Sequence, residues 1–524
     1  MKTNKRPYIT VLSLFTLLAA GAQTPGGVGE PLSWKKSCHT TDSISLRGKG
    51  LTFVGVGQVT DNGNREQTLW SIGTPTSTTF LQTTSRTADL KRDAFMNYTN
   101  DTLPELRMYS YCNSSQDTSG KKLYIGHATQ KGIPARDLQY PFKEYVIYDR
   151  ALSLQERNRV ESCLALNHGV TLQHSYLNSD GTVIWNHVTG KAYSHRIGGI
   201  IVDSISGLKR TKGSSSEKGS FLLVSDPALS DKQSLLWGDN NKPLRFVSST
   251  AKGKWFQRQW KLSATNMQGE KVDVTASTRA VQQINPLTDG EYYWLAVDPT
   301  GSGEFPVRSV KYYKSATSSD DSLRFHDVTV TDDAIWSLRA GRNMFTSIQV
   351  SQSESPDSVG GTLDVLITGG TPPYDNTLTK DQSVIYDHTS TDTLLTVINL
   401  PEGRYHLSTT DKMGIHDTKE FEITATGIRD LAYEDGNSQS DDMFRHITAS
   451  PNPTKDGNVD VEIETSQAFP ITLTLYTSGG QVVSRKEFGA DSYQFTRICL
   501  PSSGVYLLKA ECGKTERTLK LIRK

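Results

Sequence analysis

The sequence predicts a multidomain all-β protein, and three observations support this fold class. The chain has 524 residues, which exceeds one ordinary domain of about 100–200 residues. Hydrophobic residues make up 35% of it, enough for several buried cores. Alternating apolar and polar runs dominate and strong helical stripes are few, a pattern typical of strands separated by turns. We therefore expect a string of β-sandwiches.

The charge balance argues against nucleic acid as a partner. The formal net charge is only +1. No stripe of basic residues interleaved with aromatic residues follows any predicted strand or helix, and such a stripe is the usual footprint of nucleic-acid binding.

The first 22 residues have the three parts of a secretory signal peptide. Two lysines and an arginine within residues 2–6 are basic, Tyr8–Leu18 is apolar, and Ala20 and Ala22 flank a glycine at a small-residue cleavage site. The apolar run is short for a hydrocarbon core of about 30 Å. We predict cleavage between Ala22 and Gln23, hence export.

Residues 34–172 are expected to form one domain of short strands closed by a helix, after a loose Gly/Pro-rich leader over 23–33. A capping box at Ser153 and Glu156 begins the helix and Gly169 ends it. The run from Glu144 to Leu172 resembles the end of concanavalin A-like (laminin G-like) domains of Bacteroidetes surface proteins. That resemblance implies a lectin-like jelly-roll sandwich, a fold often used to bind glycans or proteins.

Two further β regions follow. Residues 173–345 are β-rich and predict additional β structure. In residues 346–424, the segments GGTPPY at 369–374, LPEGRY at 400–405 and TDKMG at 410–414 resemble the repeat of SprB-type gliding adhesins. That resemblance implies an immunoglobulin-like domain. The acidic, polar residues 425–445 predict a flexible linker.

Residues 446–524 contain a series of motifs in a fixed order. Ser450-Pro451-Asn452-Pro453 opens the segment, and strand patterns, glycines and a basic end follow. The series resembles the type IX secretion (Por) C-terminal sorting domain, itself immunoglobulin-like. The residues that carry the resemblance are Ser450, Pro451, Asn452, Pro453, Gly480, Gly504, Tyr506 and Lys520. The resemblance implies type IX secretion machinery and its sorting peptidase as partners, a cut within 425–445, and either attachment to lipopolysaccharide or release.

The sequence carries no recognisable catalytic set, so we expect a protein that is not an enzyme and needs no cofactor or metal. Nucleophile-elbow, HExxH and P-loop motifs are absent, and the histidines are scattered. Asp298–Glu304 has acids at both ends of a Gly/Ser loop, as some calcium loops do. Its intermediate positions offer only hydroxyls, so a hairpin turn is favoured.

Four residues have a proposed role that the pattern alone leaves open. Trp34 and Trp237 are the tryptophans we expect to be exposed, where they would contact a glycan or protein ligand. Cys499 and Cys512 lie on successive predicted strands and either form a disulfide or are two buried thiols.

The sequence therefore supports three functions in a stated order. The first is a cell-surface or outer-membrane binding protein, an adhesin delivered through its C-terminal domain. The second is a secreted polysaccharide hydrolase, which needs two carboxylates facing each other across a cleft. The third is a signalling or assembly component of the secretion system at the envelope.

Overall fold

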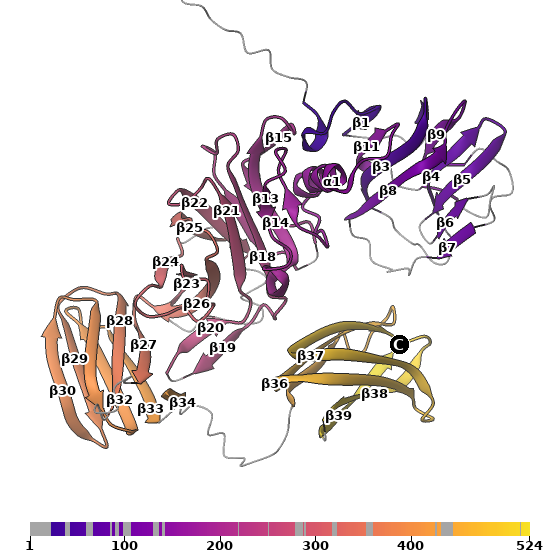
Figure 1. Cartoon of the computed structure of the whole chain (residues 1–524). Helices are drawn as coiled ribbons and strands as arrows, with labels where there is room; N and C mark the ends of the chain where they lie inside the picture. The colour runs from indigo at the N-terminus through magenta and orange to yellow at the C-terminus, as the bar shows by residue number, and fades with distance from the viewer. Residues whose placement is uncertain are drawn as a thin grey trace, which may run out of the picture. The chain divides into compact units, whose positions relative to one another are not determined.

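A computed structural model shows a multidomain all-β protein, which confirms the predicted fold class (Figure 1). It describes residues 23–36, 42–58, 67–83, 86–89, 94–97, 106–128, 136–138, 142–217, 219–249, 251–277, 287, 290–316, 322–352, 360–424, 427–430, 444–513 and 515–524. The chain divides into two compact units, Met1–Asp430 and Leu431–Lys524. The predicted leader, with Ala20 and Ala22, lies outside the described residues, whereas Gln23 is described and exposed.

The first sandwich of the larger unit has two antiparallel sheets around an aromatic core that includes Phe53, Trp70 and Phe142. One sheet has the order β1 (Ser33–Lys35), β11 (Phe142–Tyr148), β3 (Lys49–Gln58), β8 (Leu106–Asp117). The other has the order β2 (Ser43–Ser45), β9 (Lys122–Ile125), β4 (Gln67–Thr74), β5 (Ser77–Thr83), β6 (Arg86–Asp89), β7 (Ala94–Asn97), with β10 (Arg136–Asp137) parallel to β4.

Helix α1 (Leu154–His168) follows β11 and begins and ends as its sequence predicts. Ser153 and Glu156 form both hydrogen bonds of the capping box, and Gly169 adopts the left-handed conformation at the C-terminus. The buried side of α1 belongs to a core that also includes Val54 and Leu236. The predicted boundary at residue 172 therefore crosses a shared core.

The expectation of a loose leader over 23–33 is wrong for its first half. The short 3-10 helix η1 (Pro25–Gly27) packs against α1, where the Arg159 guanidinium donates to the Gly26 and Gly27 carbonyls at 2.8 and 2.9 Å. Val28 is buried in the core beside α1, and its carbonyl accepts from the Tyr148 hydroxyl. Glycine permits this close approach, since a Cβ at Gly26 would lie 2.5 Å from a backbone atom of Arg159.

Among the described residues, the middle region has two main sheets and a two-stranded hairpin, and it contains the largest core. Its main sheet contains β15 (Leu208–Arg210), β14 (His195–Asp203), β18 (Ser234–Asp239), β21 (Trp260–Thr265), β26 (Ile335–Arg342), β20 (Gly253–Phe256) and β19 (Phe246–Ser249), with β23 (Glu291–Asp298) and β24 (Lys311–Lys314) attached through β26. The second contains β16 (Lys212–Gly213), β17 (Leu222–Ser225), β22 (Lys271–Ser277) and β25 (Ser322–Thr329). The hairpin β12 (Tyr176–Leu177)–β13 (Val183–Trp185) and helix η2 (Lys191–Tyr193) precede β14.

A further sandwich ends the larger unit. Its sheets are β27 (Met344–Gln352), β28 (Gly361–Gly369), β31 (Leu394–Leu400), and β30 (Ser383–Ser390), β29 (Tyr374–Lys380), β32 (Gly403–Asp411), β33 (His416–Thr424), β34 (Gly427–Asp430). The Asp411 carboxylate accepts from the Thr371, Met413 and Ile415 amides, which ties the TDKMG turn to the GGTPPY loop. Strand β34 corrects part of the linker prediction, because Gly427–Asp430 pairs with β33.

The C-terminal unit is one five-stranded antiparallel assembly around its own core (Figure 1). Its strands are β35 (Phe444–Ser450), β36 (Asn458–Thr477), β37 (Val482–Cys499), β38 (Gly504–Cys512) and β39 (Thr515–Arg523). The core consists largely of alternate residues of β36 and β38, because successive side chains of a strand point to opposite faces.

Candidate functional site

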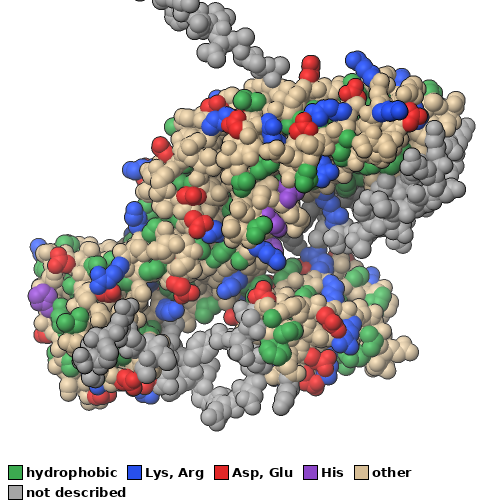
Figure 2. All heavy atoms as spheres, in the orientation of Figure 1, with side chains coloured by type: hydrophobic (Ala, Val, Ile, Leu, Met, Phe, Trp, Pro, Cys, Tyr) green, Lys and Arg blue, Asp and Glu red, His purple; other side chains and the backbone are tan. Residues whose placement is uncertain are grey.

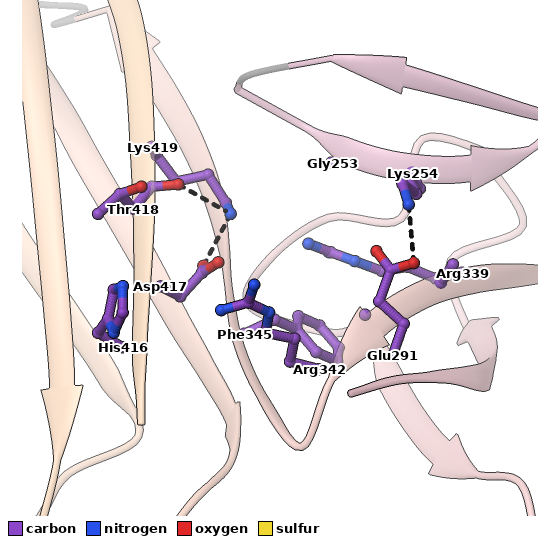
Figure 3. Close-up of a pocket in the computed structure, with 12 residues that line it drawn as sticks. Gly253, Lys254, Glu291, Arg339, Arg342, Phe345, His416, Asp417, Thr418 and Lys419 are labelled. Carbon is purple, nitrogen blue, oxygen red and sulfur yellow. Dashed lines mark hydrogen bonds and ion pairs between the residues drawn. The ribbon is translucent and has the colours of Figure 1, made fainter. Parts of the chain in front are cut away.

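A cleft of about 330 Å³ lies in the larger unit between the main middle sheet and strand β33 (Figure 3). Strands β20, β23 and β26 supply one wall, which includes Lys254, Glu291 and Arg339. Residues 416–419 of β33 supply the other. Arg342 and Phe345, at the β26–β27 connection, lie between them (Figure 3).

The Arg339 guanidinium is the most deeply placed charge of this cleft. Arg339 is 2% exposed and donates to the Thr346 carbonyl at 3.0 Å, the Ser347 hydroxyl at 2.6 Å and the Tyr312 hydroxyl at 3.3 Å. Its guanidinium carbon lies 4.1 Å from the centre of the Phe345 ring, within cation–π range. These partners are neutral, and the buried Nε has no hydrogen-bond partner among the described residues.

Lys419 is the second buried cation, at 5% exposure. Its Nζ donates to Asp417 at 2.7 Å, and burial is the main reason why its pKa is lowered, with Arg339 adding repulsion. Asp417 also accepts from the Thr346 amide and hydroxyl. Burial opposes its ionisation, but Lys419 and these hydrogen bonds lower its pKa.

Two further cations line the cleft. Lys254 forms an ion pair with Glu291 at 2.7 Å, while Arg342 is exposed. The four cations Lys254, Arg339, Arg342 and Lys419 face two carboxylates, so the cleft holds an excess of two positive charges. On the face of the molecule shown in Figure 2, acidic and basic side chains are interspersed. The cleft therefore suits a polar, negatively charged ligand.

A buried polar cluster joins the first sandwich to α1 and explains the position of Trp34. Glu144 is 1% exposed and accepts from the Trp34 indole at 2.6 Å, Asn167 at 2.7 Å and His168 at 2.8 Å. Burial raises its pKa, but these three hydrogen bonds together hold the pKa below its ordinary value of 4.5. Trp34 is half-buried, with Lys36 over its ring. Its indole N–H is therefore engaged in a hydrogen bond within the fold and is not directed to a ligand.

Trp237 is a core residue and not a surface platform for a ligand. It is 2% exposed and belongs to the core of the middle region. The expectation that Trp237 is exposed is therefore wrong. Gly238 and Asp239, which follow it, continue strand β18, and the Asp239 carboxylate is itself buried and held by the Arg196 guanidinium.

The disulfide alternative for Cys499 and Cys512 is not realised, because both thiols are free. Cys499 is exposed and lies opposite Asn458. Cys512 is buried and lies opposite Ile471, further along β36. The other alternative, two buried thiols, holds only for Cys512.

The Asp298 loop opens the long connection between β23 and β24, and its own groups satisfy the Asp298 carboxylate. Asp298 accepts from the Thr300 amide and hydroxyl, the Ser302 hydroxyl and the Gly303 amide. Burial opposes its ionisation, but these bonds lower the pKa of Asp298. In the part of the chain that the structure describes, no group of three His, Cys, Asp or Glu side chains is placed to hold a metal ion.

Some residues of the C-terminal motif contact the last strand. The Asn452 side chain donates to the Lys520 carbonyl at 2.7 Å and accepts from the Ile522 amide at 2.9 Å. Ser450 ends β35, and cis peptide bonds precede Pro451 and Pro453. Gly504 begins β38 opposite the end of β39.

Tyr506 and Gly480 have separate structural roles. The Tyr506 ring is buried and its hydroxyl donates to the Ser502 carbonyl at 3.0 Å. Gly480 has a φ of +82° in the turn that joins β36 to β37, where a left-handed conformation favours glycine. Lys520 is exposed, and it is its carbonyl that contacts Asn452.

Sequence reasoning missed Arg339, Lys419 and Glu144. Lys419 lies in a strand that alternates between buried and less buried residues, whereas Glu144 and Arg339 lie in strands that are buried almost throughout. Nothing in the local sequence separates a buried charge in such strands from a solvated one. The one available signal was a charge at an inward-facing position, as in Glu144-Tyr145-Val146, but strand register must be known before such a position can be assigned.

No described helix is long and apolar enough to cross a bilayer.

Comparisons with known proteins give a partial match. Residues 156–334 match the model of a family described as a domain of unknown function, DUF8202. That segment begins in α1 and ends before β26, so it covers the shared core and most of the middle region. No curated protein sequence matches the chain.

Several solved structures share low similarity with the chain. A two-domain fibronectin type-III segment of chicken tenascin is 12% identical, covers 34% of this chain and 99% of its own, and gives a TM-score of 0.13. A point mutant of NanB sialidase from Streptococcus pneumoniae is 11% identical, with coverages of 94% and 99% and a TM-score of 0.20. Dimeric latent PorU from Porphyromonas gingivalis is 11% identical, with coverages of 58% and 35% and a TM-score of 0.15. We draw no functional argument from these similarities.

Proposed function

We propose that this chain is an exported cell-surface binding protein, an adhesin, and that its C-terminal unit directs delivery by type IX secretion. The observation that carries the proposal is the C-terminal unit itself. It is a separate compact unit with its own core, and Asn452 of its SPNP segment is hydrogen-bonded to the last strand. A separate folded unit can be recognised by secretion machinery, and removed by a peptidase, without disturbing the rest of the chain.

The order of parts along the chain supports the same proposal. The secretory signal at residues 1–22 would take the chain across the inner membrane, and the unit from residue 431 would then direct passage across the outer one. Residues 431–443 lie between β34 and β35 and are where we propose that a sorting peptidase cuts. Attachment to lipopolysaccharide would follow that cut.

Binding is a better proposal than hydrolysis for the larger unit. The cleft carboxylates, Glu291 and Asp417, each form an ion pair with a lysine. A glycosidase needs one protonated carboxyl group, which acts as the general acid and transfers its proton to the leaving group. Lys419 and Thr346 lower the pKa of Asp417 against the effect of burial. A lowered pKa favours the ionised carboxylate, whereas a general acid must be protonated.

Deletion of residues 446–524 in the native organism tests the proposal. We expect the truncated chain to accumulate in the periplasm, while the full chain is accessible to protease on intact cells. A full chain carrying Arg47→Glu, an exposed change in the larger unit, is the control and should reach the surface. Surface display of the truncated chain at the level of the full chain would contradict the sorting role.

A further inference from the structure

We propose that the cleft between β20, β26 and β33 is a binding site for an oxyanion, the carboxylate, sulfate or phosphate group of a small polar ligand. Nothing in this inference depends on how the chain is delivered, so it stands or falls separately from the sorting role. It places a recognition site at the junction of the middle region with the last sandwich of the larger unit, whereas the sequence predicted ligand contacts at Trp34 and Trp237.

The first step is the uncompensated charge of Arg339. A buried guanidinium is costly unless it is paired or fully hydrogen-bonded. Arg339 makes hydrogen bonds only to neutral groups, its Nε has no partner, and no carboxylate among the described residues forms an ion pair with it. Aromatic rings compensate part of this cost through cation–π contacts.

The second step is that the nearest buried ion pair does not balance this charge. Lys419 extends from β33 toward the Arg339 side of the cleft (Figure 3). Its own partner, Asp417, is already engaged by Lys419 and by two donors of Thr346. Asp417 therefore pairs with Lys419 and leaves Arg339 without a carboxylate partner among the described residues. An anion entering the cleft would be attracted by both cations.

The third step is the accessible lining. Arg342 is exposed and forms no ion pair among the described residues, so its guanidinium is available to a ligand. It lies between the Arg339 wall and Asp417 (Figure 3). An arginine matches the planar, bidentate geometry of a carboxylate, sulfate or phosphate. The volume of about 330 Å³ is at the small end of ligand pockets, which favours an ion or a single sugar-sized group.

A purely structural role for Arg339 explains less of this arrangement. Its bonds to Thr346 and Ser347 do connect β26 to β27. Those bonds account for its burial, but a connection of strands does not require Lys254, Arg342 and Lys419 to line the same cleft. The excess of positive charge is what a structural role leaves unexplained.

Calorimetric titration of the full chain at low ionic strength tests the site. The probes are sulfate, inorganic phosphate and glucuronate, with glucose as the neutral control. We expect at least one anion to bind with a Kd of about 1 mM or lower, and glucose not to bind. Preference for sulfate or phosphate would identify a free ion as the source, and preference for glucuronate an acidic saccharide.

Two matched charge reversals separate the cleft from general electrostatics. Arg342→Glu should weaken anion binding about tenfold or more, whereas Arg47→Glu, the same change at an exposed arginine outside the cleft, should leave it within about twofold. Both positions are exposed, so both variants should fold, which circular dichroism checks. Absence of anion binding to the unmodified chain, equal binding of glucose, or an equal effect of the two substitutions would overturn the proposal.

Discussion

The two compact units hold themselves together by different means. In the larger unit, buried and half-buried polar side chains join segments far apart in the sequence: Trp34 bonds to Glu144 across 110 positions, and Arg159 to Gly26 across 133. In the C-terminal unit, strands pair around an aliphatic core, and the motif residue Asn452 lies at an exposed turn. Single polar substitutions should therefore damage the larger unit more than the C-terminal one.

The largest effect should come from Glu144→Ala, which removes a buried carboxylate and leaves the donors of Trp34, Asn167 and His168 without their acceptor. We expect a loss of about 3–5 kcal/mol in the free energy of unfolding of the larger unit. All eight tryptophans precede residue 431, so urea unfolding followed by tryptophan fluorescence reports on this unit alone. Glu30→Ala, at an exposed position, is the control. A loss below about 1 kcal/mol would show that the cluster does not hold the unit together.

Acid should weaken the larger unit through the same carboxylate. The folded state holds the Glu144 pKa below 4.5, because three hydrogen bonds outweigh the effect of burial. The resulting stabilisation is present above pH 4.5 and is lost as the pH falls through the lower folded pKa. Glu144→Gln removes this ionisation, so its stability should change less between pH 6 and pH 3 than that of the unmodified chain. Identical pH profiles would assign the acid sensitivity to other groups.

A smaller loss is expected from Gly26→Ala, which tests whether η1 is part of the fold. The new Cβ would lie 2.5 Å from the Arg159 backbone, at a φ of +62°. Gly120→Ala is a matched control, because Gly120 has a φ of +67° and open space around it. We expect losses of about 2–3 kcal/mol for Gly26→Ala and about 1 kcal/mol for Gly120→Ala by fluorescence-monitored unfolding. Equal losses would mean that the segment does not pack against α1.

The smallest effect should be that of Asn452→Ala in the C-terminal unit. It removes two hydrogen bonds at an exposed position, which we expect to cost about 1 kcal/mol. Hydrogen exchange of the β39 backbone, read by mass spectrometry, should accelerate there and leave the larger unit unchanged. If Asn452→Ala lowered the free energy of unfolding as much as Glu144→Ala, the proposed difference between the two units would be contradicted.

The sequence predicted what depends on local pattern and missed what depends on distant pairing. The capping box at Ser153 and Glu156, the helix stop at Gly169 and the alternation in β36 were all predictable, because each is set by neighbouring residues. The packing of residues 25–28 against α1 was not. A Gly/Pro-rich run signals a loop, and only the folded chain shows that its glycines permit close contact.

The candidate cleft illustrates the same limit. Lys254, Arg339 and Lys419 come from three strands, and no spacing in the sequence connects them. The prediction that Trp237 is exposed was wrong, because a tryptophan in a strand can point inward as readily as outward. The C-terminal motif was found because its residues follow one another in order, although the contact of Asn452 with β39 could not be foreseen.

The central claim is that the C-terminal unit is a sorting signal that works without the rest of the chain. Fusion of this unit to another protein tests the claim most directly. Residues 425–524 would be fused to a periplasmic reporter with its own signal peptide and expressed in the native organism. The account predicts that the reporter becomes accessible to antibody on intact cells, and that the same fusion lacking residues 446–524 does not. A reporter that stays in the periplasm with the whole segment attached would contradict the claim.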